Sequence, residues 1–165
     1  DPGPAFGTGQ HPTTQMCLQL IEKLRKPEHW TMLDVGTGSG ILSVYGAKLK
    51  ATRILAIDID PEAVRWAKRN IELNDLSGKI ELSTRPLHQI SGSFSIIAAN
   101  LVYEEIIKLF PLFPGLLNPG GWLILSGILR NQENEINELL ENYRFEEYQS
   151  LYQEEWACLA SKRVR

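Results

Sequence analysis

The chain has 165 residues, of which 43% are hydrophobic and 22% are charged, and its formal net charge is −3. This length suits one domain with a two-layer or three-layer core, and the charge argues against non-specific binding to nucleic acid, which needs a basic face. Cys17 and Cys158 belong to no metal-binding or disulfide motif, so we expect no metal. The sequence shows no apolar run of membrane length and no signal peptide. We expect a cytoplasmic protein and a monomer.

The first fourteen residues are rich in glycine and proline and cannot form a regular element. Part of this segment has the composition of a loop that closes over a ligand, namely Phe6, Gly7, Thr8 and Gly9. The alternative is a plain lead-in to a helix capped by Thr13 or Thr14. Helical spacing of apolar residues predicts that helix, with a buried face of Met16, Cys17, Leu20, Ile21 and Leu24.

A turn with three alternate glycines comes next, between an apolar run at 31–33 and a second helical pattern. It reads D-V-G-T-G-S-G from Asp34 onward, whereas the dinucleotide pattern G-x-G-x-x-G needs its third glycine one position later. The form resembles the first motif of Rossmann-like methyltransferases that use S-adenosylmethionine (SAM). Gly36 and Gly38 permit a tight turn and close approach of a ligand, and Asp34 suits a cationic, polar ligand end. A tight turn without a ligand is the alternative.

A second apolar run, at 53–57, predicts a strand that ends in a carboxylate, Asp58. In open α/β sheets an acid at this place accepts hydrogen bonds from ribose hydroxyls. Asp60 and Pro61 then match the cap and the first position of another helix. We therefore expect a cofactor that carries a nucleoside, with Asp58 as its ribose ligand and Asp60 as a structural cap.

The remaining pattern completes an α/β fold. Further strands are expected at 79–83, 94–99 and 122–126, a turn at 118–121, a helix at 132–142, and an antiparallel pair at 145–152 and 156–162. No linker or repeat interrupts the chain, so residues 1–165 are expected to form one domain. The predicted architecture is a Rossmann-like α/β fold: a seven-stranded, mostly parallel sheet with helices on both faces.

Asn100 follows the most apolar of these strands. A polar side chain at the carboxyl end of a central strand faces the crevice in which ligands bind. Methyltransferases that act on planar amino groups have N/D-P-P-Y here, but this chain reads N-L-V-Y, ending at Tyr103, which disfavours a flipped base or an amide as substrate. The alternative role for Asn100 is to cap the helix before Glu104.

Longer motifs resemble one family, PrmA. The run F-G-T-G-Q-H-P-T-T from position 6 matches it, as do D-V-G-T-G-S-G-I-L from position 34 and I-D-I-D-P from position 57. The first run is far more specific than the glycine loop, which most SAM enzymes share. The resemblance extends to the E-W pair at 155–156 and so covers the whole chain. It implies a class I SAM-dependent methyltransferase that modifies the eleventh protein of the large ribosomal subunit, on lysine side chains and the N-terminal amine.

The resemblance also assigns the site. It implies cofactor contacts at Thr14, Gly36, Asp58 and Asn100. We interpret Asn100 as the residue that positions the acceptor amine, and residues 1–14 as a loop that closes over the cofactor. Family members normally carry an N-terminal domain for substrate recognition, and no part of this sequence corresponds to it. We expect this domain to bind SAM but to need the other one for recognition of the ribosomal protein.

Two other functions stay open at the level of sequence. The first is a related SAM-dependent methyltransferase that acts on RNA or on a small molecule. The second is a module that binds SAM or a nucleotide without catalysis, such as a sensor or an assembly factor. Asn100 and the complete N-terminal loop favour an enzyme over a binding module.

Overall fold

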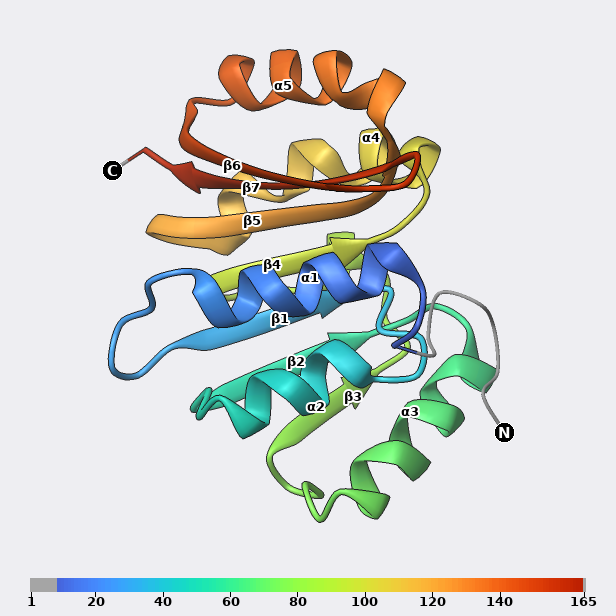
Figure 1. Ribbon diagram of the computed structural model, residues 1–165. Coiled ribbons are helices and arrows are strands. Elements are labelled where there is room, and N and C mark those ends of the chain that lie inside the picture. Colours follow the sequence, from blue (N-terminus) through green and yellow to red (C-terminus); the bar gives the residue numbers. More distant parts are fainter. Residues whose placement is uncertain (1–8, 165) are drawn as a thin grey trace.

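A seven-stranded sheet forms the centre of the molecule (Figure 1). The computed structural model describes residues 9–164, apart from the side chain of Glu147. The strand order is β3-β2-β1-β4-β5-β7-β6; the first five are parallel, and β7 is antiparallel to both β5 and β6. Their bounds are β1 (Thr31–Val35), β2 (Arg53–Ile57), β3 (Ile80–Ser83), β4 (Phe94–Asn100), β5 (Leu117–Leu129), β6 (Phe145–Gln153) and β7 (Trp156–Arg163). The predicted sheet is confirmed.

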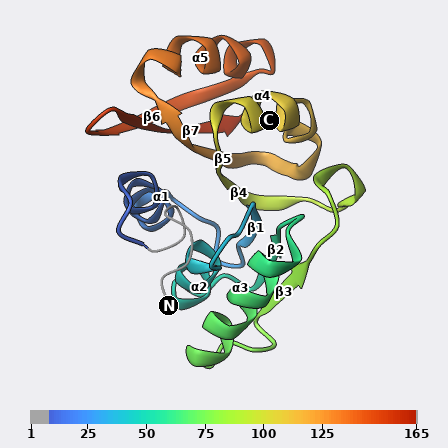
Figure 2. The ribbon, with the colours of Figure 1, turned by 90° about the vertical axis from the view of Figure 1, so that its right-hand side faces the viewer.

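Helices cover both faces of the sheet, as predicted. Figure 2 shows α1 and α4 on opposite sides of the strands. The apolar residues of α1, α2 and α3 pack in one hydrophobic cluster, and those of α4 and α5 pack in another. The bounds are α1 (Pro12–Lys23), α2 (Ile41–Lys48), α3 (Pro61–Leu73), α4 (Tyr103–Leu109) and α5 (Glu133–Asn142). Across residues 9–164, no helix has both the length and the apolar character needed to cross a bilayer.

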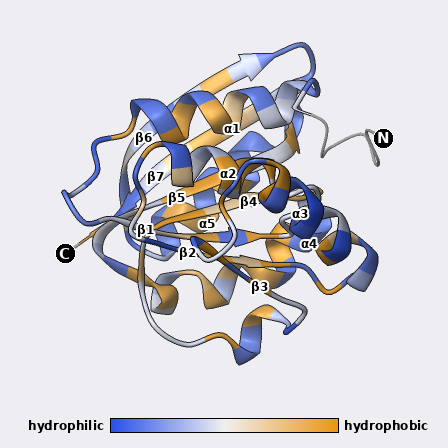
Figure 3. Ribbon diagram, turned by 90° about the horizontal axis from the view of Figure 1, so that it is seen from below, coloured by the Kyte–Doolittle hydropathy of each residue, from blue (hydrophilic) through white to orange (hydrophobic). Residues whose placement is uncertain are grey.

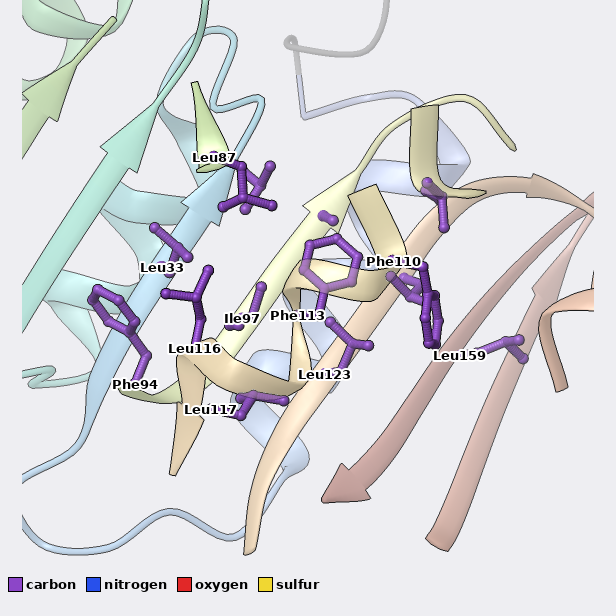
Figure 4. Close-up of a cluster of buried hydrophobic side chains, with 14 of the residues drawn as sticks. Leu33, Leu87, Phe94, Ile97, Phe110, Phe113, Leu116, Leu117, Leu123 and Leu159 are labelled. Carbon is purple, nitrogen blue, oxygen red and sulfur yellow. The ribbon is translucent and has the colours of Figure 1, made fainter. Parts of the chain in front are cut away.

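The central strand β4 divides the hydrophobic core into two layers. Its first six residues are buried, as expected for a parallel strand covered on both faces. Successive side chains alternate between the faces, so that Ile96 packs with α1 to α3 and Ile97 packs with α4 and α5. In Figure 4, Phe113 lies beside Ile97 and Leu123 in the second layer. Figure 3 shows the hydropathy of the residues along the ribbon, with hydrophilic and hydrophobic stretches alternating along the helices.

The start of α1 differs from the sequence prediction. The N-cap is His11, whose Nδ1 accepts a hydrogen bond from the Thr13 amide at 3.3 Å, and Pro12 occupies the first helical turn. Thr13 and Thr14 were the wrong choice because both lie inside the first turn and are fully buried against the sheet. The predicted apolar face of α1 is confirmed, and Asp60 caps α3 as expected.

The expected turn at 118–121 is also different: it lies within the bounds of β5 as an irregular bulge. Phe94 pairs with Leu117, but the next pairing joins Ile96 to Trp122, so four residues of β5 are accommodated between these two pairs. A Cβ at Gly121 would lie 2.9 Å from the carbonyl oxygen of Asn118. The backbone therefore folds back on itself here while the strand continues.

The topology fixes where a ligand can bind. The order of the strands reverses between β1 and β4, which are neighbours in the sheet. In open α/β sheets a crevice opens outside the carboxyl ends of the strands at this switch point. Gly36 follows β1, Asp58 follows β2, and Asn100 ends β4. Three of the predicted site residues therefore lie at this edge of the sheet.

Candidate cofactor site

The loop between β1 and α2 has the backbone geometry that its glycines require. Gly36 has φ of 71°, and a Cβ at this position would overlap the side chain of Leu101. The amides of Gly36 and Thr37 both donate to the carbonyl oxygen of Ile57, at 2.9 Å. Gly40 caps α2 in the left-handed conformation, with φ of 82°. The loop is thus bonded to β2 and packed against the chain that follows β4, which links three strands at the switch point.

A buried carboxylate supports this loop from below. Asp34 is 1% exposed, and its Oδ2 accepts hydrogen bonds of 2.7 Å from the hydroxyls of Thr37 and Ser43. Its Oδ1 is buried and has no hydrogen-bond partner among the described residues. Desolvation raises the pKa of the Asp34 carboxyl to about 6; the two hydroxyl donors lower it, and the charge of Asp58 raises it further. Asp34 therefore lies beneath the loop rather than at its surface.

Asp58 joins the glycine loop to the end of β2. Its Oδ2 accepts a hydrogen bond from the Gly38 amide at 3.0 Å, and its Oδ1 accepts one from the Asp60 amide at 3.1 Å. The carboxylate is half-buried. Since each carboxylate oxygen has two lone pairs, both oxygens keep capacity for a further donor. Asp58 thus has a structural role in addition to the ribose-binding role predicted for it.

Thr14 and Asn100, which are far apart in sequence, meet at the carboxyl end of β4. The Asn100 Nδ2 donates to the Thr14 Oγ1 at 3.2 Å, while the Asn100 Oδ1 is buried and has no partner among the described residues. The helix-capping alternative for Asn100 is wrong, because Val102 is the N-cap of α4. A buried carbonyl oxygen without a donor is costly, which favours a ligand donor at this place.

Two further contacts fix the start of α1 against the sheet. The Ser126 hydroxyl of β5 donates to the carbonyl oxygen of Thr13 at 2.9 Å, and both groups are buried. The imidazole of His11 packs edge-on against the indole of Trp156, with ring centroids 5.3 Å apart. The segment that leads into α1 therefore enters directly above the ends of β4 and β5.

The structure brings most of the predicted residues to one place. Gly36, Gly38 and Asp58 form one bonded group, and Thr14 and Asn100 form a second. Leu101, which follows Asn100, packs against Gly36 and connects the groups. The other predicted residues, Phe6, Gly7 and Thr8, lie outside the described residues. The ligand roles of all these positions stay predictions.

Two residues of this region were missed by the sequence analysis. Ile59 lies between Asp58 and Asp60 and is 73% exposed. An apolar residue between a strand-end acid and a helix cap was the available signal. Leu101 carried no signal, because its contact with Gly36 depends on the sheet. Tyr103, by contrast, donates its hydroxyl to Glu135 and belongs to the contact between α4 and α5.

Comparison with known proteins identifies the family. The family model described as ribosomal protein L11 methyltransferase (PrmA) matches residues 1–164. The chain belongs to this family. The ribosomal protein L11 methyltransferase of Geobacter sp. (strain M21) is 43% identical over 99% of this chain, and that of Gloeobacter violaceus is 39% identical over 98%. The chain covers 54% and 51% of these proteins, so it spans about half the length of the curated relatives it matches.

Solved structures agree with the family assignment. A crystal structure of ribosomal protein L11 methylase from Lactobacillus delbrueckii subsp. bulgaricus is 34% identical, with a TM-score of 0.88 over 95% of this chain and 81% of that one. Magnesium protoporphyrin IX methyltransferase from Synechocystis PCC 6803, solved with bound SAM, has a TM-score of 0.73 over 92% of this chain and 78% of that one. Its identity is 19%, so it shows a shared fold.

The buried carboxyl of Asp34 predicts a pH dependence of stability. Because its pKa is raised to about 6, the folded protein binds more protons than the unfolded chain between about pH 4 and about pH 6. Its contribution to the free energy of unfolding is therefore complete below the pKa of the unfolded chain and is lost as the pH rises through the pKa of the folded protein. The loss is about 3 kcal/mol for a shift of about two pKa units. Asp34→Asn keeps an acceptor for both hydroxyls and does not titrate.

Urea unfolding at several pH values checks this expectation. Across that window, the free energy of unfolding of the wild type should fall relative to that of Asp34→Asn. A constant difference between the two proteins would show that folding does not raise the pKa of the Asp34 carboxyl.

Proposed function

We propose that this chain is the catalytic domain of a SAM-dependent methyltransferase that modifies lysine side-chain and N-terminal amines of ribosomal protein L11. The relatives that match nearly the whole chain are named for methylation of this protein. The observation that carries the proposal is the bonded arrangement of the Gly36–Gly38 turn with Asp58 at the switch point, in a chain of the PrmA family. A protein of the same fold has been solved with SAM bound.

The residues at this edge fit the chemical parts of SAM. The lone pairs left on the Asp58 carboxylate suit the two ribose hydroxyls. The exposed side chain of Ile59 offers an apolar surface for the adenine ring. The glycine turn and the amino end of α2 present amides and a positive dipole end to the carboxylate of the methionine part. Phe6, Gly7 and Thr8, in the segment that precedes α1, are proposed to close over it, and Thr14, in the first turn of α1, to line the site.

Asn100 is proposed to position the acceptor amine. Its buried Oδ1 lacks a donor, and its amide nitrogen is held by Thr14 at 3.2 Å, so the carbonyl direction is fixed. An amine N–H would satisfy this oxygen. When bound, SAM supplies a methyl group already activated by the sulfonium, so the contribution of the protein is proximity, orientation and a partly dry pocket that favours the neutral amine.

Recognition of the ribosomal protein is proposed to need more than these residues. The chain spans about half the length of its relatives, and the site residues above account for the cofactor and one amine. Several amines of one substrate must reach a fixed methyl donor at different angles. Binding energy from remote parts of the substrate is what orients it for the reaction, and the additional part of the longer relatives is the proposed source.

Loss of the Asp58 carboxylate should weaken SAM binding. Asp58→Ala removes the ribose acceptor, and hydrogen bonds to a charged acceptor contribute about 1.5–3 kcal/mol, or about tenfold to a hundredfold in affinity. Asp60→Ala is the matched control, because it removes a nearby carboxylate that caps α3. Calorimetric titration with SAM should show the loss in the first variant alone. If folded Asp58→Ala and folded Asp60→Ala bind SAM with equal affinity, Asp58 is not part of the site.

Methyl transfer tests the substrate. Purified ribosomal protein L11 incubated with this chain and SAM should slowly gain mass in steps of about 14 Da, one for each hydrogen that a methyl group replaces. Mass spectrometry would locate the methyl groups on amines. Extending the chain with the additional part of the Geobacter relative should raise the rate without changing the SAM affinity. An isolated chain that already works as fast as the extended one would place recognition within these 165 residues.

Asn100→Ala in the extended protein tests whether Asn100 positions the amine for methyl transfer. It should lower kcat by about tenfold or more, as expected for loss of an orienting hydrogen bond, with a smaller change in SAM affinity. An unchanged kcat would remove Asn100 from the reaction.

A further inference from the structure

A hollow lies at the amino ends of the parallel strands, opposite the candidate cofactor site. Its volume is about 870 Å³, and it is formed by the loop after α1 (25–28), the start of β4 (95–96), the bulge and following residue of β5 (118–122), and Lys162 near the end of β7. In Figure 1 these segments come together at the left, whereas β1 and β2 run toward the right. Small-molecule sites have volumes of about 300–1,000 Å³, so the hollow has the size of such a site.

The charge of this hollow is opposite to that of the whole chain. Arg25, Lys26 and Lys162 line it together with one carboxylate, Glu28. Three positive groups and one negative group give a local charge of +2 in a chain of net charge −3. Because these groups converge on one concave place rather than along a face, the surroundings favour a compact anion over an extended nucleic-acid backbone.

Two of the cations are held in place by their surroundings. The Lys26 Nζ donates to three carbonyl oxygens at the carboxyl end of α1, those of Ile21 at 2.5 Å, Leu24 at 2.8 Å and Glu22 at 3.3 Å, so its three N–H donors are used and it contributes charge alone. The Nζ of Lys162 lies 5.9 Å from the centre of the Trp122 ring. These contacts limit the movement of both side chains, so less ordering is needed when an anion binds.

Arg25 supplies the donors that the two lysines do not. It is exposed, and its guanidinium makes no ion pair or hydrogen bond with the residues that the structure describes. A guanidinium offers five N–H donors in a planar fork that matches the oxygens of a phosphate group. In this hollow it is therefore the group best suited to contact an oxyanion directly.

The opposite wall consists largely of backbone. Gly120 and Gly121 carry no side chains, and the φ of Gly120 is 78°. Gly121 is packed against the carbonyl oxygens of Asn118 and Ser95, whereas Gly120, in the left-handed conformation, has no side chain to cover the main chain of the bulge. We propose that this hollow binds a small ligand with several phosphate charges, of about the size of a nucleotide, at a site separate from the cofactor site. Ser95, the second residue of β4, and Asn100, its last, are about 16 Å apart at about 3.3 Å per residue.

Sodium tripolyphosphate is the probe for this site. Calorimetric titration of the whole chain at low salt should give saturable 1:1 binding, and Arg25→Gln and Lys162→Gln should each weaken it about tenfold. Lys68→Gln is the matched control, because it removes the same charge from an exposed position on α3. Glutamine keeps most of the aliphatic stem, and urea unfolding would confirm that each variant is folded.

Competition experiments separate this site from the cofactor site. Saturating SAM should leave the affinity for tripolyphosphate unchanged, and tripolyphosphate should bind equally well to Asp58→Ala. Three results would overturn the proposal: tripolyphosphate at millimolar concentration shows no saturable binding, Lys68→Gln loses as much affinity for it as Arg25→Gln and Lys162→Gln do, or SAM displaces it. Tighter binding of a ten-nucleotide RNA that depends on Arg25 and Lys162 would also overturn it, since the ligand would then be a nucleic acid. None of these results depends on whether the chain methylates a ribosomal protein.

Discussion

Two carboxylates on neighbouring strands hold the glycine loop on which the candidate site depends. Asp34 accepts two hydroxyl hydrogen bonds beneath the loop, and Asp58 accepts the amide of Gly38 at its rim. Burial of Asp34 costs free energy, as the raised pKa of its carboxyl shows, but the bonds that it accepts fix the turn from β1 into α2. The loop in turn directs the amino end of α2 toward the crevice at the switch point.

The fold was predictable because its signals are local. Apolar runs marked the central strands and alternating patterns marked the others, and the glycine turn and the Asp60–Pro61 pair marked the connections between strands and helices. The errors fell where tertiary contacts decide the local structure. Thr13 and Thr14 have good capping side chains, but packing against the sheet buries them and leaves the cap to His11. The turn at 118–121 became a bulge of β5 because pairing resumes at Trp122.

The site was predictable in part. Gly36 and Asp58 follow strands directly, so sequence order alone placed them at one edge of the sheet. Thr14 came from a family resemblance, because its partner Asn100 is 86 positions away and the bond between them requires the folded sheet. The exposure of Ile59 and the cationic hollow at the opposite edge could not be predicted, since each depends on segments that meet only in three dimensions.

The central claim is that the bonded group around the glycine loop is a SAM site with the ribose at Asp58 and the reacting end at Asn100. A crystal structure of the protein with S-adenosylhomocysteine, the demethylated product of SAM, tests this most directly. The account predicts ribose hydroxyls within hydrogen-bond distance of the Asp58 carboxylate, the adenine against Ile59, and the sulfur beside Asn100. Binding of the product at any other place, or with its ribose away from Asp58, would contradict it.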